Sequence, residues 1–298
     1  MAHVVPRYPV PNGDSFRLMP LTDEECDRIA EAMTLDGFLA PMLEDLKDDL
    51  RADHPVWFDF AERVNRVGVT TWTSYDIHVE DYHVNHFIPV VVRLMARAMN
   101  SFSACVMLAN RGLTVEAGTH ARSVYEAAFW LAWFKNRPNM AIREFVMDDL
   151  ISQRGLLKDE ISLTPEGCGK HERLSQKLAD IERSIPSSQG KANMFDIATD
   201  GGFGPQYAAY RVLCTHAAHA SVTSTNRYLR VFGPGEAGHE LSPDRDGIPQ
   251  ILNFGVHAMM TATMSFAMIV DHDEGIERIS KLITEWSLFS GGLVTSVD

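Results

Sequence analysis

The stretch Val124-Tyr-Glu-Ala-Ala-Phe-Trp-Leu-Ala-Trp-Phe134 decides the fold, because it is apolar around the whole circumference of a helix. A helix that is hydrophobic on all sides belongs in the interior of a protein, surrounded by other helices. Thr114 opens this helix, and Asn136-Arg-Pro138 ends it, since a proline suits the first turn of the next helix. We therefore expect a buried helix over residues 114–136.

Helical periodicity also dominates on both sides of this stretch, and no alternating strand pattern competes with it. Short breaks at residues 110–112 and 136–138 separate three long helices between about residues 86 and 161. Long helices with short connections pack as antiparallel neighbours in an up-and-down bundle. The expected helices cover residues 22–32, 37–51, 57–67, 86–110, 114–136, 139–161, 168–184, 205–230, 249–271 and 273–289.

Composition narrows the class of protein. The 298 residues include 45% hydrophobic residues and carry a net charge of −13. Length alone predicts about two domains, but the run of helices favours an all-α fold, with an N-terminal arm and helical cap in residues 1–80 and a helical bundle in residues 81–298. The negative net charge excludes an extended DNA-binding surface but is compatible with a local basic site that binds RNA.

The N-terminal stretch contains Pro6, Pro9 and Pro11 and lacks the apolar run of a secretory signal. We therefore expect a cytoplasmic protein whose four cysteines are reduced and buried, with no cofactor. Residues 248–270 carry no Asp, Glu, Lys or Arg and are long enough to cross a bilayer. Polar residues such as Asn253 and Thr261 instead favour a central helix of the bundle, and no membrane contact is expected.

Glu126 is the most demanding residue of the apolar stretch, since its surroundings are expected to take the carboxylate out of water. Arg122 precedes it by four residues and lies about 40° away around a helix, so the two can pair. One interpretation is an ion pair that fixes the helix register; the other is a carboxylate with a perturbed pKa lining an internal pocket. The residues expected to join such a pocket are Arg143, His120, Tyr125, Asp148 and Asp149.

A second polar group occupies residues 207–221, between two long loops at about 186–205 and 233–249 that are rich in Gly, Pro and Ser. His216 and His219 are three residues apart, so they project to one side of a helix. There they suit phosphate binding, proton relay or a shared metal, unless they are hydrogen-bonded within a tight core. The cationic residues of this local basic site are Arg211, His216, His219, Arg227 and Arg230.

Arg211 and His216 spell R-x4-H, which resembles the signature of the HEPN superfamily of helical ribonucleases and toxins. Residues 122–126 and the segment ending at His219 resemble a bacterial all-helical family of uncharacterised function, and the resemblance covers about residues 90–230. The HEPN resemblance implies a homodimer in which Arg211 stabilises phosphate charge while His216 serves as general acid or base. The reaction implied is metal-independent attack of a ribose 2′-hydroxyl on the adjacent phosphate. On an unbroken α-helix a five-residue offset sets this pair about 140° apart.

A third cluster places His78, His83 and His86 within nine residues. Glu80 and His83 form E-x-x-H, a unit found in di-iron helical bundles. The cluster is either a metal site or a solvated helix start with acidic residues in its first turn. Three functions therefore stay open: a metal-independent ribonuclease of toxin or defence type, a non-catalytic helical binding or regulatory protein, and a metalloprotein that uses the histidine cluster.

Overall fold

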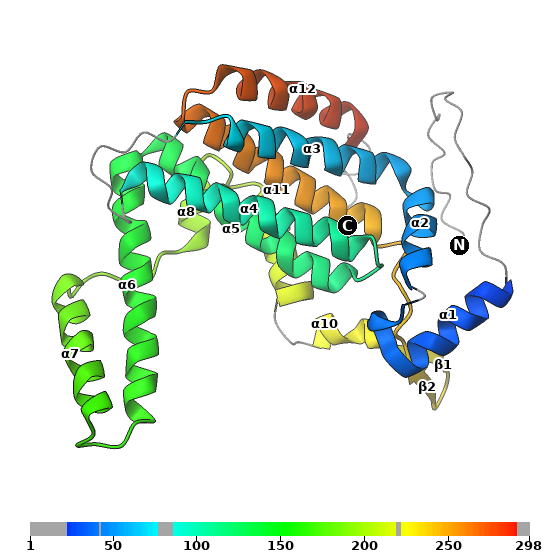
Figure 1. Ribbon diagram of the computed structural model, residues 1–298, viewed down its shortest axis with the longest axis horizontal. Helices are drawn as coiled ribbons and strands as arrows, with labels where there is room; N and C mark the ends of the chain where they lie inside the picture. The colour runs from blue at the N-terminus through cyan, green and yellow to red at the C-terminus, as the bar shows by residue number, and fades with distance from the viewer. Residues whose placement is uncertain (1–22, 42, 77–85, 219–221, 291–298) are drawn as a thin grey trace.

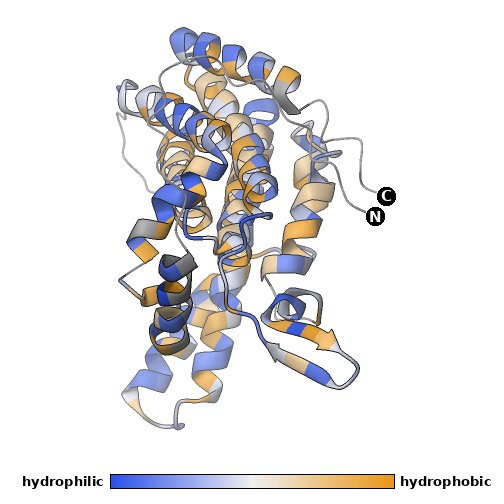
Figure 2. Cartoon of the chain, turned by 90° about the vertical axis from the view of Figure 1, so that its right-hand side faces the viewer, coloured by the Kyte–Doolittle hydropathy of each residue, from blue (hydrophilic) through white to orange (hydrophobic). Residues whose placement is uncertain are grey.

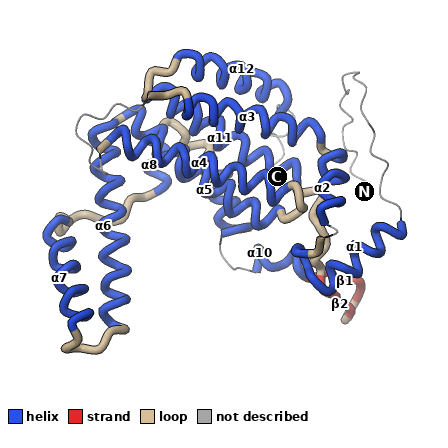
Figure 3. The backbone as a smooth tube through the Cα atoms, viewed as in Figure 1, coloured by secondary structure: helices blue, strands red, loops and turns tan. Residues whose placement is uncertain are grey.

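Helices make up nearly all the regular structure of residues 23–41, 43–76, 86–218 and 222–290, which the computed structural model describes (Figures 1 and 3). The all-α prediction is confirmed. The helices are α1 (Asp23–Asp36), α2 (Leu43–Asp53), α3 (Pro55–Thr73), α4 (Phe87–Ala109), α5 (Thr114–Asn136), α6 (Pro138–Ser162), α7 (Gly169–Ser184), α8 (Met194–Asp200), α9 (Tyr207–Leu213), α10 (Val222–Thr225), α11 (Ile248–Ile269) and α12 (Asp273–Ser290).

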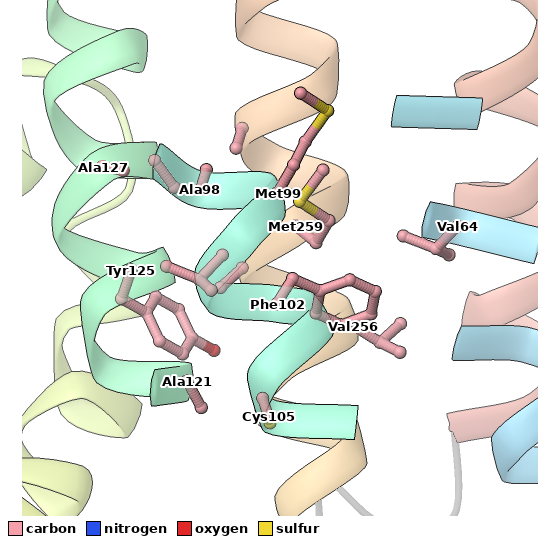
Figure 4. Close-up of a cluster of buried hydrophobic side chains, with 14 of the residues drawn as sticks. Val64, Ala98, Met99, Phe102, Cys105, Ala121, Tyr125, Ala127, Val256 and Met259 are labelled. Carbon is pink, nitrogen blue, oxygen red and sulfur yellow. The ribbon is translucent and has the colours of Figure 1, made fainter. Parts of the chain in front are cut away.

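The centre of the bundle is the pair α5 and α11, and α4 packs against both (Figures 1 and 4). Phe102 of α4, Tyr125 of α5 and Met259 of α11 are buried where these three helices meet. Because α5 is apolar on every side, it needs neighbours all around it, and α6, α8 and α9 cover its remaining faces. α3, although it falls within residues 1–80, packs on α4, α11 and α12 in the same core.

α4 and α11 are both long and apolar enough to cross a membrane by length and composition. Within the described residues, 72% of the most apolar window of α11 and 50% of that of α4 are buried in the bundle. Thr261, Thr263 and Ser265 are themselves buried on α11. The segment 248–270 is therefore the central bundle helix that its polar residues predict.

α6 and α7 form a helical hairpin that projects from the bundle (Figure 1). A small apolar cluster of Leu157, Ile181 and Ile185 holds the two helices together, separately from the main core. Figure 2 shows hydrophilic colour over much of this projecting hairpin. The start of α6 is joined to the bundle through its contacts with α5.

The helix predicted over residues 205–230 is wrong in its second half. After α9 the chain forms a π-helix (Cys214–Ala218), α10 and a 3-10 turn (Asn226–Tyr228). It then enters strand β1 (Leu229–Gly233), which pairs antiparallel with β2 (Glu236–His239). The β-branched and aromatic residues of β1 favour a strand, and Gly235, with φ of +85°, allows the reversal. The expectation that no strand pattern competes with helical periodicity is therefore wrong for residues 229–239.

The loop predicted over residues 186–205 is interrupted by the short helix α8. Asn193 caps this helix, since its side-chain oxygen accepts a hydrogen bond from the backbone N–H of Phe195 at 2.9 Å. α8 packs on α5 and brings the following segment to the start of α9.

Candidate functional site

A cleft of about 470 Å³ opens between α5 and α9. Four of the residues around it follow one another at positions 207, 210, 211 and 214, the spacing that shares one face of a helix. This face of α9 is turned toward α5, whose Arg122 forms part of the opposite wall. The lining residues are Arg122, Met194, Tyr207, Tyr210, Arg211, Cys214 and Thr215.

The guanidinium of Arg122 is held by three partners. Its Nη2 lies 2.7 Å from Oε1 of Glu126 and donates to the hydroxyl of Tyr210 at 3.0 Å. Its Nε donates to Sγ of Cys214 at 3.2 Å, and its Cζ lies 5.2 Å from the centre of the Tyr210 ring. Contacts with an anion, a hydroxyl, a thiol and an aromatic face fix the guanidinium in one orientation at the cleft.

The hydroxyl of Tyr210 completes this arrangement by donating to Oε1 of Glu126 at 3.0 Å. Burial raises the pKa of Tyr210 well above its ordinary value, and the negative charge of Glu126 raises it further. Burial also disfavours the charged form of Arg122, but its contacts with Cys214 and Glu126 outweigh that effect and keep the pKa of Arg122 raised. Near neutral pH the cleft therefore presents a cation beside a protonated phenol.

Glu126 is less buried than the sequence leads one to expect. Its side chain keeps 25% of its surface exposed and that of Arg122 keeps 23%, so both are half-buried. The expected pairing at four residues is formed, but the expectation that the carboxylate leaves water is wrong. The cleft beside α9 admits solvent to this side of α5.

Close contacts with α5 set the position of the π-helix. Thr119 donates its side-chain hydroxyl to the backbone carbonyl of Ala217 at 3.0 Å. A Cβ added to Gly118 of α5 would lie 2.9 Å from the Cβ of Ala217, which is closer than two such atoms can approach. Glycine at position 118 therefore lets the π-helix rest on α5, and π turns of this kind are frequent at functional sites.

The cleft receives one member of the R-x4-H pair. Arg211 lines it, whereas His216 lies exposed on the π-helix and is not among the described residues that line the cleft. His219 lies outside the described residues. The π-helix has more residues per turn than an α-helix. The angle between Arg211 and His216 around the helix axis is therefore smaller than the 140° expected for an unbroken α-helix.

The other members of the predicted basic site lie elsewhere. Arg227 donates to the hydroxyl of Thr114 at 3.0 Å, and Arg230 on β1 lies 3.6 Å from Glu240. Because residues after 218 leave the α9 direction for the β1–β2 hairpin, these two arginines do not line the cleft with Arg211. The prediction of a single cluster of these cations is therefore wrong for Arg227 and Arg230.

The residues expected to join Glu126 are also dispersed. Arg143 is exposed on α6 and has no ion pair with Glu126 in the described residues, while Asp148 and Asp149 line a different groove. Tyr125 points into the core, where its hydroxyl lies 3.1 Å from Nδ1 of His257. His120 is half-buried on α5 and does not line the cleft. The residues that do complete the site were missed, and the spacing of Tyr207, Tyr210, Arg211 and Cys214 is the signal that identifies them.

Most of the predicted metal cluster, including His78 and His83, lies outside the described residues. His86 is exposed immediately before α4. Among the residues that the structure does describe, no three His, Cys, Asp or Glu side chains are grouped so that they could hold a metal ion.

The cysteines differ in their surroundings. Cys105 is buried in the core, as expected, whereas Cys168 and Cys214 are only half-buried. Cys168 caps α7 by accepting a hydrogen bond from the backbone N–H of His171 at 3.5 Å. The prediction of buried cysteines is therefore wrong for these two, and Cys214 instead forms part of the cleft.

Comparison with protein families matches residues 89–237 to a family described as "Family of unknown function (DUF5677)". The matched span is half of the chain and runs from α4 into the β1–β2 hairpin, so it contains every residue that lines the cleft. No curated protein and no solved structure gives a significant match to the chain.

Proposed function

Since the chain belongs to the DUF5677 family of unknown function, we propose its function from the cleft: it recognises phosphate groups of RNA between α5 and α9 and cleaves the RNA without a metal ion. The observation that carries the proposal is the exposed guanidinium of Arg211, in a cleft whose other wall holds Arg122 in a fixed orientation. Two guanidiniums at one small cleft suit the oxygens of a phosphate group.

The charge balance of the cleft favours an anion. Glu126 compensates the charge of Arg122, whereas Arg211 has no ion-pair partner among the described residues. The three groups therefore leave one positive charge in excess at the cleft. In a chain of net charge −13, such a site attracts phosphate locally although the molecule as a whole repels it.

A neutral hydroxyl group adds a hydrogen-bond donor to this charge. Tyr207, Tyr210 and Thr215 all line the cleft. Tyr210 donates its proton to Glu126, and Thr215 donates its proton to the backbone carbonyl of Arg211, which leaves the hydroxyl of Tyr207 to donate to a ligand. The raised pKa of Tyr210 keeps its phenol protonated, so it supports the guanidinium without adding negative charge. Donors fixed in place before the ligand arrives stabilise charge that develops on phosphate oxygens during reaction.

Cleavage would follow the chemistry that the R-x4-H resemblance implies. The ribose 2′-oxygen attacks phosphorus while His216 accepts the proton of the 2′-hydroxyl, and the bond to the 5′-oxygen breaks as that oxygen takes a proton from water. The hydroxide that is left then takes the proton back from His216. Arg211 and Arg122 stabilise the charge on the phosphate oxygens, and the products are a 2′,3′-cyclic phosphate and a 5′-hydroxyl. In a homodimer with the α9 faces opposed, the exposed His216 would be presented beside the cleft.

A non-catalytic RNA-binding protein is the second candidate. The observation that favours it is the position of His216, which is not among the described residues lining the cleft that holds Arg211. A phosphate site without an adjacent base binds but does not cleave. In this case Arg122, Glu126 and Tyr210 would serve only to shape the binding surface.

An RNase assay on purified protein separates the two candidates. Wild type, Arg211→Ala, His216→Ala and the exposed control Arg143→Ala are incubated with single-stranded RNA, with and without EDTA. The ribonuclease proposal predicts cleavage that persists in EDTA, gives cyclic phosphate ends and is lost in the first two variants only. RNA binding without cleavage in wild type supports the second candidate, and cleavage unchanged in Arg211→Ala contradicts both roles assigned to the cleft.

The metalloprotein hypothesis for His78, His83 and His86 is a separate proposal. Metal analysis of protein purified without a chelator tests it. A stoichiometric metal that is lost in His83→Ala supports the site, and protein without bound metal contradicts it.

A further inference from the structure

A second groove, of about 420 Å³, lies between α4 and the first half of α6, which Figure 1 shows beside each other. Its two walls carry opposite charges. Arg93 and Arg97 stand one turn apart on α4, and Asp148 and Asp149 follow each other on α6. In the described part of the chain, no ion pair joins Arg97 to either aspartate.

The floor of this groove is apolar and firmly held. Leu94 of α4 is buried, and Phe145 in the first half of α6 is half-buried. The ring of Phe145 packs edge-on against two rings of α5: its centroid lies 4.9 Å from that of Trp130 and 5.6 Å from that of Phe134. Because aromatic contacts on α5 fix this ring, the floor is formed before any ligand arrives.

Both carboxylates are oriented by the protein and keep acceptor capacity. Oδ1 of Asp148 accepts a hydrogen bond from the backbone N–H of Ala192 at 2.9 Å. Oδ2 of Asp149 accepts one from Nε2 of Gln153 at 2.7 Å. An ionised carboxylate has about four acceptor positions, so each retains positions for a cationic donor.

We propose that this groove binds an α-amino acid with an aromatic side chain. The carboxylate and ammonium of an α-amino acid sit on one carbon, which matches a groove whose facing walls are cationic and anionic. The carboxylate pairs with Arg97, the ammonium pairs with Asp149, and the side chain lies on Phe145. A ligand with a single type of charge would pair with only one of Arg97 and Asp149. The groove has the size of ordinary small-molecule sites, roughly 300–1,000 Å³.

Titration calorimetry of the full chain with l-phenylalanine tests this assignment. We expect saturable binding, and binding at least about tenfold weaker for N-acetyl-l-phenylalanine and for phenethylamine, each of which lacks one charged group. Arg97→Gln and Asp149→Asn are each expected to weaken l-phenylalanine binding by about tenfold or more. Two control variants are expected to leave l-phenylalanine binding unchanged. Arg143→Gln alters an exposed residue of α6 outside the groove, and Arg211→Ala alters the cleft between α5 and α9.

Thermal unfolding of every variant shows whether it is folded at the temperature of the titration. The proposal is overturned if wild type shows no saturable binding up to about 10 mM l-phenylalanine. It is also overturned if both single-charge analogues bind as tightly as the amino acid, or if the folded Arg97→Gln and Asp149→Asn variants bind it like wild type.

Discussion

The hydroxyl of Tyr210 donates a hydrogen bond to Oε1 of Glu126 at 3.0 Å, across 84 residues of sequence. The same hydroxyl accepts a hydrogen bond from Arg122, so one phenol joins both members of an ion pair on α5. The wall of the cleft is therefore a unit shared by α5 and α9. Its geometry depends on hydrogen bonds that need residues of both helices.

Replacing Tyr210 with Phe removes the shared hydroxyl and keeps the aromatic ring near Arg122. Loss of two half-buried hydrogen bonds is expected to lower the free energy of unfolding by about 1–2 kcal/mol. Urea denaturation measures this change. Tyr207→Phe removes another hydroxyl from the same cleft. That hydroxyl has no hydrogen bond to the described residues, so its loss is expected to change stability by less than about 0.5 kcal/mol. Equal effects of the two substitutions would contradict the bridging role of Tyr210.

The ion pair between Arg122 and Glu126 is expected to couple the two residues energetically. Arg122→Met, Glu126→Gln and the double variant form a mutant cycle in which the partners are half-buried and share Tyr210. A coupling free energy of about 1 kcal/mol is expected, larger than that of an exposed pair at the same spacing. The exposed pair of Lys281 and Glu277 serves as the comparison. If this coupling free energy is no larger than that of Lys281 and Glu277, partial burial and the hydrogen bonds of Tyr210 do not strengthen the ion pair.

Gly118 is expected to be required for the contact between α5 and the π-helix. Gly118→Ala places a methyl group 2.9 Å from the Cβ of Ala217, so it should destabilise the protein by about 1 kcal/mol or more despite the better helix propensity of alanine.

Gly155 provides a matched control for this substitution, since it lies within α6 and a Cβ added there meets nothing within 4 Å. Gly155→Ala is expected to stabilise the protein by about 0.5–1 kcal/mol. The midpoint temperatures of thermal unfolding of the two variants should therefore shift in opposite directions from that of wild type. Stabilisation by both would show that the π-helix does not rest on α5 as described.

His257 is expected to make stability depend on pH in the acidic range. Burial lowers the pKa of His257 in the folded protein below its ordinary value of 6.5. The unfolded chain then binds a proton at a pH where the folded chain does not, so this contribution is complete above pH 6.5 and declines as the pH falls toward the lowered folded value.

His257→Gln keeps an acceptor for the hydroxyl of Tyr125 and removes the titrating group. Its free energy of unfolding should therefore fall less than that of wild type between pH 7 and pH 5. Urea denaturation at the two pH values measures the difference. An equal decline in both proteins would contradict the assigned pKa direction.

The sequence predicts the parts of the fold that depend on local pattern. The apolar circumference of residues 124–134 identifies α5 as a central helix, and Thr114 and Asn136 mark both of its ends. The spacing of Arg122 and Glu126 predicts their ion pair, because four residues along a helix return to the same face. These features require no knowledge of the surrounding chain.

The cleft itself depends on how distant segments meet, which local pattern does not reveal. The sequence predicts Glu126 in a dry interior, but its side chain, which is hydrogen-bonded to Tyr210 of α9, keeps 25% of its surface exposed. The π-helix arises where the chain must pass over Gly118, a residue on another helix. For the same reason the predicted continuous helix ends before Arg227, which instead contacts Thr114.

Equilibrium binding of a short single-stranded RNA to Arg211→Ala, compared with wild type and Arg143→Ala, tests most directly that the cleft recognises phosphate. Fluorescence anisotropy at several salt concentrations gives both the affinity and its salt dependence. The account predicts that Arg211→Ala binds about tenfold or more weakly and reduces the salt slope by about 0.7, as loss of one phosphate contact requires, while Arg143→Ala changes neither. Wild-type protein that does not bind the RNA, or an Arg211→Ala variant that binds it like wild type, would contradict the account.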